Sequence, residues 1–151
     1  GGLLALSQNP EQWAKLRANP ALVPSLVAET IRYQTPVIHM RRTATRDVEF
    51  GGKLIRKGDK VVMWYVSGNR DESVIDNPDA FIIDRAKPRQ HLSYGAGIHR
   101  CVGDRLADLQ LRILWEEILR RDLDIEVMGP PRRLYSNFIR GIRALPVRIN
   151  A

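Results

Sequence analysis

The segment that follows Cys101 carries the strongest constraint on folding in this sequence, an amphipathic helical pattern. Its apolar residues recur at spacings of three and four, the period of one helix face, and they are Leu106, Leu109, Ile113, Leu114 and Ile118. The pattern predicts a helix of about 20 residues. Because one whole face of such a helix is apolar, we expect it to pack against a large surface.

Two shorter helices are expected nearer the start of the chain. Asn9 is a residue type suited to helix capping, and Pro10 after it fits the first position of a helix. A second helix is expected over about residues 24–33, with an apolar face, and Thr35-Pro36 stops it.

The remaining segments favour strands and loops. Residues 39–66 are rich in β-branched and aromatic residues and contain Gly turns, which is typical of short strands in hairpins. Residues 67–90 are polar with Gly, Asn and Pro breaks, so we expect a meandering connection with at most one short helix. Residues 124–149 again favour strands, paired across a turn near Asn137. The expected fold is mainly α-helical with small β-sheets, in a single domain over residues 1–151.

Composition and charge narrow the function classes. The chain has 151 residues, of which 44% are hydrophobic and 27% are charged, as in globular proteins. Its net charge of +7 favours an acidic partner, and three classes fit: a nucleic acid, an anionic membrane and an acidic protein. One cysteine permits no internal disulfide, and no secretory signal pattern opens the chain, so we expect a cytoplasmic location. No apolar run approaches the roughly 20 residues that span a bilayer, and we expect no membrane association.

The first ten residues, GGLLALSQNP, lack an initiator Met and resemble the last turns of an apolar helix. We therefore expect the chain to be a fragment that begins inside a structural element.

Cys101 lies at the start of the long helix, after a loop that contains Gly95 and Gly97. Free backbone N–H groups at a helix start favour a thiolate, which suits a metal ligand or a nucleophile. Together with Gly103, these glycines let the backbone approach a flat ligand closely. A buried structural cysteine remains an alternative.

The sequence has too few Cys and His residues for a structural zinc site, and it shows no general base for a cysteine nucleophile. A structural zinc site uses four Cys or His ligands, whereas this chain has one Cys and three scattered His. A cysteine nucleophile needs a general base, and the spacing of the histidines singles out none. A metal already held by a macrocycle needs only one thiolate from the protein.

Three motifs resemble the cytochrome P450 family. The stretch SYGAGIHRCVG is similar to the family's haem-binding loop, with Cys101 as the iron ligand. The stretch ETIR supplies the Glu-x-x-Arg pair, Glu29 and Arg32, and Arg85 in PDAFIIDR completes a buried triad in the family. The resemblance implies the C-terminal part of the P450 fold.

The resemblance also implies how haem b and a substrate are held. Haem propionates would contact Arg42, His99 and, as a weaker candidate, His91. The residues implied in cofactor binding are Arg42, His91, Tyr94, Gly95, His99, Cys101 and Gly103. The family usually has Phe where this chain has Tyr94, and a hydroxyl beside the sulfur is expected to hydrogen-bond and to shift the iron potential. The residues implied in lining an apolar substrate pocket are Val37, Ile38, His39, Met40 and Phe138, although core packing is an equal alternative for Val37 and Ile38.

The activity that the resemblance implies is that of a haem-thiolate monooxygenase, which inserts one oxygen atom of O2 into a C–H bond. The stretches VIHMRRTA and KGDKVVMWYVSGNRDE are similar to soluble bacterial hydroxylases of alkanes, fatty acids and terpenoids. Electrons would come from NAD(P)H through a reductase and a ferredoxin, which would dock on the basic residues Lys87, Arg89, Arg100, Arg105 and Arg112. The central helix that carries the acid and alcohol residues in the family is not in this chain, so no catalytic residue is assigned and the fragment alone is expected to be inactive.

Two alternatives from other classes remain. A haem-binding protein without turnover would share every motif above. A basic nucleic-acid-binding module would explain the pairs Arg41-Arg42 and Arg132-Arg133, but the sequence contains no known nucleic-acid-binding motif.

Overall fold

The computed structural model describes residues 1–150 and contains helices together with four two-stranded sheets. Its helices are α1 (Gly2–Gln8), α2 (Pro10–Ala18), η1 (Pro20–Leu22), α3 (Val23–Gln34), α4 (Tyr65–Gly68), η2 (Gly97–His99) and α5 (Asp104–Arg120). Its strands are β1 (His39–Thr43), β2 (Val48–Phe50), β3 (Lys53–Ile55), β4 (Lys60–Trp64), β5 (Asp124–Val127), β6 (Arg132–Arg133), β7 (Ile142–Ala144) and β8 (Val147–Asn150). The predicted fold class, mainly α with small β-sheets, is confirmed.

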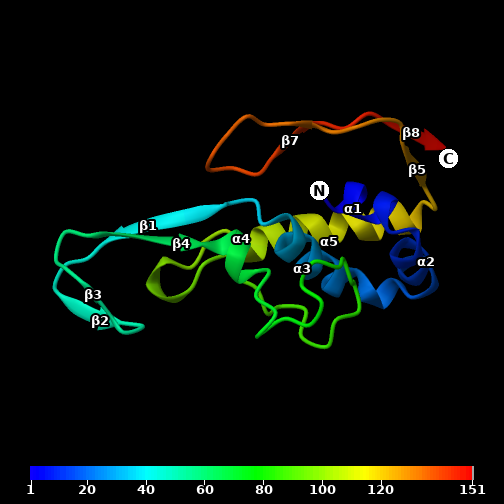
Figure 1. Ribbon diagram of the computed structural model, residues 1–151. Coiled ribbons are helices and arrows are strands. Elements are labelled where there is room, and N and C mark those ends of the chain that lie inside the picture. Colours follow the sequence, from blue (N-terminus) through cyan, green and yellow to red (C-terminus); the bar gives the residue numbers. More distant parts are fainter. Residues whose placement is uncertain (151) are drawn as a thin grey trace.

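The four sheets are antiparallel pairs that lie in two places, beyond one end of the helices and above α1 (Figure 1). β1 pairs with β4 and β2 with β3, and these hairpins extend from one end of the helical layer (Figure 1). β5 pairs with β8 and β6 with β7, and this ribbon runs above α1. The expected turn near Asn137 connects β6 to β7 and is confirmed. Within the described residues, no helix is both long and apolar enough to cross a membrane.

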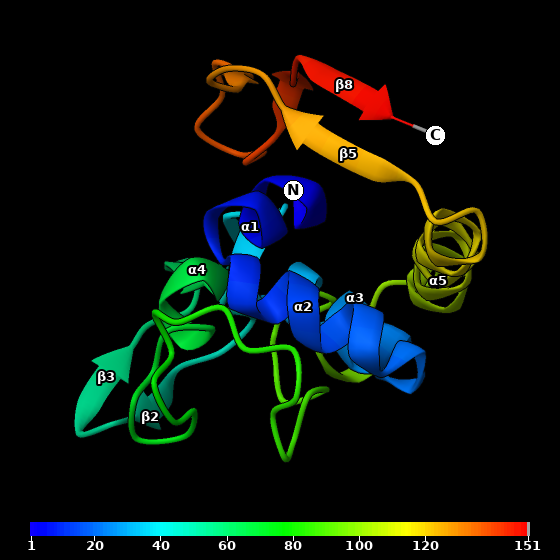
Figure 2. The ribbon, with the colours of Figure 1, turned by 90° about the vertical axis from the view of Figure 1, so that its right-hand side faces the viewer.

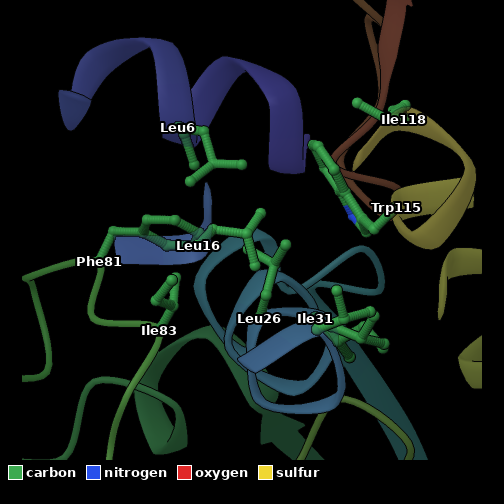
Figure 3. Packing of buried hydrophobic residues seen from close by; sticks show 11 residues of the cluster. Leu6, Leu16, Leu26, Ile31, Phe81, Ile83, Trp115 and Ile118 are labelled. Carbon is green, nitrogen blue, oxygen red and sulfur yellow. The ribbon is translucent and has the colours of Figure 1, made fainter. Parts of the chain in front are cut away.

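The core lies where α1, α2, α3 and α5 meet a loop that carries Phe81 and Ile83 (Figure 3). Leu16 and Leu26 are fully buried there. Trp115 of α5 meets Trp13 of α2 edge to face, with ring centroids 5.8 Å apart. Each large side chain of this kind stabilises the fold by about 1.5–3 kcal/mol through burial, so Leu26→Ala is expected to cost about 2–5 kcal/mol.

Particular residues explain where α3 ends and how α2 begins. α3 ends at Thr35, which adopts a left-handed φ of 42° and donates its hydroxyl to Arg32 O at 2.6 Å. Pro36 follows and cannot continue the helix. α2 begins at Pro10 with Asn9 at its N-cap, as predicted, but the Asn9 side chain makes no cap hydrogen bond to α2 and instead donates to Ala5 O in α1 at 2.8 Å.

The long helix after Cys101 is confirmed, but of its apolar stripe only Ile118 is buried in the core of the described residues, while the other four residues are exposed. α5 has 17 residues, and its buried residues are Trp115 and Ile118. Leu106 is 59% exposed and Leu114 is 53% exposed. α5 lies at the edge of the helical layer (Figure 2), so one side packs on α3 while the other carries unpartnered apolar side chains. A helix that is apolar on both sides is typical of the interior of a larger protein.

Candidate functional site

The loop from Tyr94 to Cys101 is closed at its two ends by a backbone hydrogen bond. Cys101 N donates to Tyr94 O at 2.8 Å, and Arg100 N donates to Gly97 O at 3.0 Å. Gly95 and Gly97 adopt left-handed φ values of 70° and 66°, which residues with a Cβ rarely adopt. The loop therefore depends on both glycines, and it leaves the thiol of Cys101 exposed just before α5.

Space around this loop fits a flat group at the sulfur. A Cβ added at Gly97 would meet no atom within 4 Å, and one at Gly103 would lie 3.9 Å from Cys101 Sγ. The apolar side chains of Ile98 and Val102 on either side are fully exposed. Large exposed apolar residues beside an exposed thiol are typical of a surface that another group covers.

The Tyr94 hydroxyl, which was expected to lie beside the sulfur, points toward α5. The hydroxyl donates to Asp108 Oδ1 on α5 at 2.8 Å, so its hydrogen bond goes to a carboxylate and not to the sulfur. Burial, together with this carboxylate, raises the pKa of Tyr94 well above its ordinary value. Tyr94 therefore remains a neutral hydrogen-bond donor.

The three candidate propionate contacts come from separate segments. Arg42 lies on β1, and the one side-chain hydrogen bond it makes within the described residues goes to Arg41 O at 3.0 Å. His99 is exposed on η2. His91 Nδ1 is buried without a hydrogen-bond partner among the described residues, and burial lowers the pKa of this imidazole. A buried nitrogen without a partner is costly, so its position fits a site that an anionic group completes.

Glu29, Arg32 and Arg85 form a buried ionic cluster. Arg32 Nε and Arg85 Nε both donate to Glu29 Oε2, at 2.7 Å and 3.0 Å. The side chain of Glu29 is 0% exposed and that of Arg32 is 1% exposed. The remaining donors of the two guanidinium groups bond to backbone carbonyls of residues 69–80, including Pro78 O and Ala80 O. The cluster thus fixes a long loop, which lacks helices and strands over residues 69–96, onto α3.

Asn69 is a central residue that sequence reasoning missed. Its side chain is fully buried, accepts from Leu92 N at 2.6 Å and donates to Ser93 Oγ at 2.8 Å and Thr35 Oγ1 at 2.9 Å. It therefore connects the end of α3 to the residues that lead into the cysteine loop. The only signal in the sequence is an Asn in a polar stretch, SGNRDE, which resembles any turn.

The residues implied in substrate binding come from two segments that lie side by side. Ile38 N donates to Phe138 O at 3.0 Å, and Val37 forms a β-bridge with Ile139. The His39 ring lies between Trp64 and Phe138, at centroid distances of 4.9 Å and 5.8 Å. Met40 lies next along β1, opposite Met63 of β4. The structure thus brings four implied substrate contacts, namely Val37, Ile38, Met40 and Phe138, to one end of the β1–β4 hairpin.

The basic residues near the cysteine loop differ in how far acidic neighbours neutralise them. Arg100 pairs with Asp104 at 2.7 Å, and Arg112 pairs with Glu116 at 3.2 Å. Arg105 forms no ion pair within the described residues. A groove of about 330 Å³ lies at the surface beside α3 and α5. It is lined by Pro24, Val27, Arg89, Arg105, Asp108, Leu109 and Arg112. Three of these seven residues are arginines, so the groove is basic.

Known proteins are similar to this chain in both sequence and fold. The family model for cytochrome P450 matches residues 3–133. Linalool 8-monooxygenase of Pseudomonas putida is 48% identical over 145 residues, which is 96% of this chain and 36% of that protein. Cytochrome P450-terp of a Pseudomonas species is 44% identical over 98% of this chain and 34% of its own length. The solved structure of cytochrome P450-153 from Novosphingobium aromaticivorans superposes with a TM-score of 0.95 at 50% identity, over 99% of this chain and 38% of that one. The chain therefore spans about a third of the length of the relatives it matches.

Proposed function

Because this chain belongs to the cytochrome P450 family, we propose that it supplies the haem-thiolate part of a monooxygenase in which Cys101 ligates the iron of haem b. The observation that chiefly supports this proposal is the position of Cys101, exposed between a loop with two left-handed glycines and the start of α5. A single thiolate from the protein is sufficient for an iron that a porphyrin already holds.

The other residues of the site would hold and orient the haem. Arg42, His91 and His99 offer one guanidinium and two imidazole groups for propionates, and charge-assisted hydrogen bonds of this kind are strong. The buried, unpartnered His91 Nδ1 supports its assignment. When bound, haem supplies the iron chemistry that activates O2 for insertion of one oxygen atom into a C–H bond.

The substrate is proposed to be an apolar molecule such as an alkane, a fatty acid or a terpenoid. Val37, Ile38, Met40 and Phe138 offer apolar side chains at one end of the β1–β4 hairpin, where they would exclude water and orient such a molecule. The name of one relative, linalool 8-monooxygenase, favours a terpenoid.

Electrons are proposed to come from NAD(P)H through a reductase and an acidic ferredoxin. The basic groove that Arg89, Arg105 and Arg112 line is the surface we assign to the ferredoxin. Opposite charges on two partners raise their association rate, and this effect weakens as salt screens it.

The iron ligand is tested by spectroscopy on the whole protein. Wild-type protein, reduced and exposed to carbon monoxide, is expected to show the red-shifted Soret band of thiolate-ligated haem. Cys101→His is expected to abolish this band, whereas Arg120→Gln at the far end of α5 is expected to retain it. An unchanged band in Cys101→His would exclude Cys101 as the ligand.

A further inference from the structure

Tyr94 contacts α5 from the start of the cysteine loop, as Arg100 does through Asp104 near the loop's end. Its carbonyl accepts the hydrogen bond from Cys101 N at 2.8 Å, so its backbone closes the loop around the sulfur. Its hydroxyl donates to Asp108 Oδ1 at 2.8 Å, 14 residues further along the chain. One residue thus joins the backbone of Cys101 to the second turn of α5.

The surroundings of Tyr94 restrict its ring as well. The ring packs against the core cluster, the guanidinium of Arg100 lies 5.8 Å from its centroid, and the His91 ring lies 5.5 Å away. Asp108 is held from a second side by Arg89, whose Nη2 is 3.7 Å from Asp108 Oδ2. The Tyr94 ring is therefore restrained before the hydrogen bond forms, which limits the entropy that the bond costs, whereas the side chain of Arg89 is 76% exposed and adds little restraint on Asp108.

The rest of the loop lacks comparable restraints. Gly95 and Gly97 have no side chains, and Ile98 and Val102 are exposed. Arg100 pairs with Asp104, but the side chain of Arg100 is itself 54% exposed, and exposed pairs contribute little. Among the loop's side chains, Tyr94 is therefore the one that both packs on the core cluster and donates a hydrogen bond to α5.

We infer that the hydrogen bond from Tyr94 to Asp108 fixes the cysteine loop on α5 and thereby positions the Cys101 sulfur for ligation of the iron. The inference rests on the proposed function, because it assigns a role relative to the haem iron. In this role Tyr94 and Asp108 would be positioning residues that act through the cysteine loop. A phenylalanine at position 94 would fill the same space but would lack the donor.

The test measures how fast thiolate ligation is lost in the whole, haem-loaded protein. The reduced, carbon-monoxide-bound protein is placed in moderate urea, and the decay of the red-shifted Soret band is followed. Tyr94→Phe and Asp108→Ala are each expected to lose the band about fivefold to tenfold faster than wild type, the effect of one net hydrogen bond. The double variant is expected to decay no faster than the single variants, because both remove the same bond.

Two further variants separate positioning from general destabilisation. Asp108→Asn retains an acceptor oxygen and is expected to decay at a rate near that of wild type. Arg89→Gln removes the ion pair with Asp108 but retains the hydrogen bond, and is also expected to match wild type. If Asp108→Ala fails to load haem, Tyr94→Phe alone decides.

The outcomes that overturn the inference are distinct from those that overturn the proposed function. Equal decay in wild type and Tyr94→Phe, or equal acceleration in Asp108→Asn and Asp108→Ala, would overturn the positioning role alone. A wild-type protein that binds haem without the thiolate band would overturn the proposed ligation, and this inference with it.

Discussion

Arg85 and Glu29 are 56 residues apart in sequence, yet Arg85 Nε donates to Glu29 Oε2 at 3.0 Å. The same oxygen accepts from Arg32 at 2.7 Å, and Ile82 N donates to the other carboxylate oxygen at 2.9 Å. A buried carboxylate with these donors is stable only while they remain, because desolvation penalises an isolated charge. The ion pair between Arg85 and Glu29 therefore attaches the loop that leads toward Cys101 to α3.

Removing one partner from this cluster is expected to destabilise the protein strongly. Arg32→Ala leaves Glu29 with one arginine and strands backbone carbonyls, so it is expected to cost about 3–5 kcal/mol in the free energy of unfolding. Urea unfolding of the whole protein measures this value. The matched control is Lys15→Ala, which breaks the exposed pair with Asp84 and is expected to cost under about 1 kcal/mol. Equal costs for the two variants would contradict a structural role for the buried cluster.

Asn69→Ala is expected to weaken both the fold and the cysteine loop. The substitution leaves Leu92 N without its acceptor and removes the donor to Ser93 and Thr35. Each buried polar group left without a partner costs about 1–3 kcal/mol. We expect a loss of this order in urea unfolding, together with faster decay of the thiolate Soret band. Asn137→Ala, at an exposed turn, is the control and is expected to lie within about 0.5 kcal/mol of wild type. An Asn69→Ala protein as stable as this control would show that Asn69 is dispensable.

The sequence predicted those features whose cause is local. The period of α5 and the Thr35-Pro36 stop depend on neighbouring residues, and both are present in the structure. The role of Asn69 depends on Leu92, Ser93 and Thr35, which are 23 to 34 residues away, and nothing in its own neighbourhood signals them. The exposure of Leu106 has a similar origin, since periodicity shows that a face is apolar but not which partner covers it.

In the candidate site, too, some features could be predicted from local sequence and others depend on distant partners. Motif resemblance pointed to the buried cluster of Glu29, Arg32 and Arg85, whose contacts are present in the structure. It named no partner for the Tyr94 hydroxyl, because the direction of a side chain depends on the helix that packs beside it, here through Asp108. The roles of Arg42, His91 and His99 toward haem remain predictions.

The proposed role of His91 is tested through the pH dependence of haem loss. Burial holds the pKa of His91 below its ordinary value of 6.5. A propionate beside the imidazole would raise this pKa, so haem binding would take up a proton between the two pKa values. His91 would then strengthen haem binding as pH falls through the haem-bound pKa, and would contribute little above it.

We therefore compare wild type with His91→Asn in the rate of haem transfer to an excess of a haem-accepting protein. The ratio of the two rates is expected to rise to about tenfold near pH 6 and to approach one above about pH 8, as for a charged hydrogen bond that forms only with the protonated imidazole. His39→Asn is the control, and its ratio is expected not to vary with pH. A ratio for His91→Asn that stays constant over this range would show that His91 does not contact a propionate.

The basic groove beside α5 makes a separate prediction about the electron donor. Arg105 has no ion pair within the described residues, whereas Arg112 pairs with Glu116, so Arg105 presents the less neutralised charge. Arg105→Glu is expected to lower the second-order rate of reduction by an acidic ferredoxin about tenfold at low salt, and Arg112→Glu less. Stopped-flow reduction of the whole protein at increasing ionic strength measures both the rate and its salt dependence. The control is Arg148→Glu on β8, where the arginine pairs with Glu126 outside the groove. The difference between Arg105→Glu and wild type is expected to shrink as salt screens the charges. If neither groove variant differs from Arg148→Glu in rate or in salt slope, the donor docks on another face.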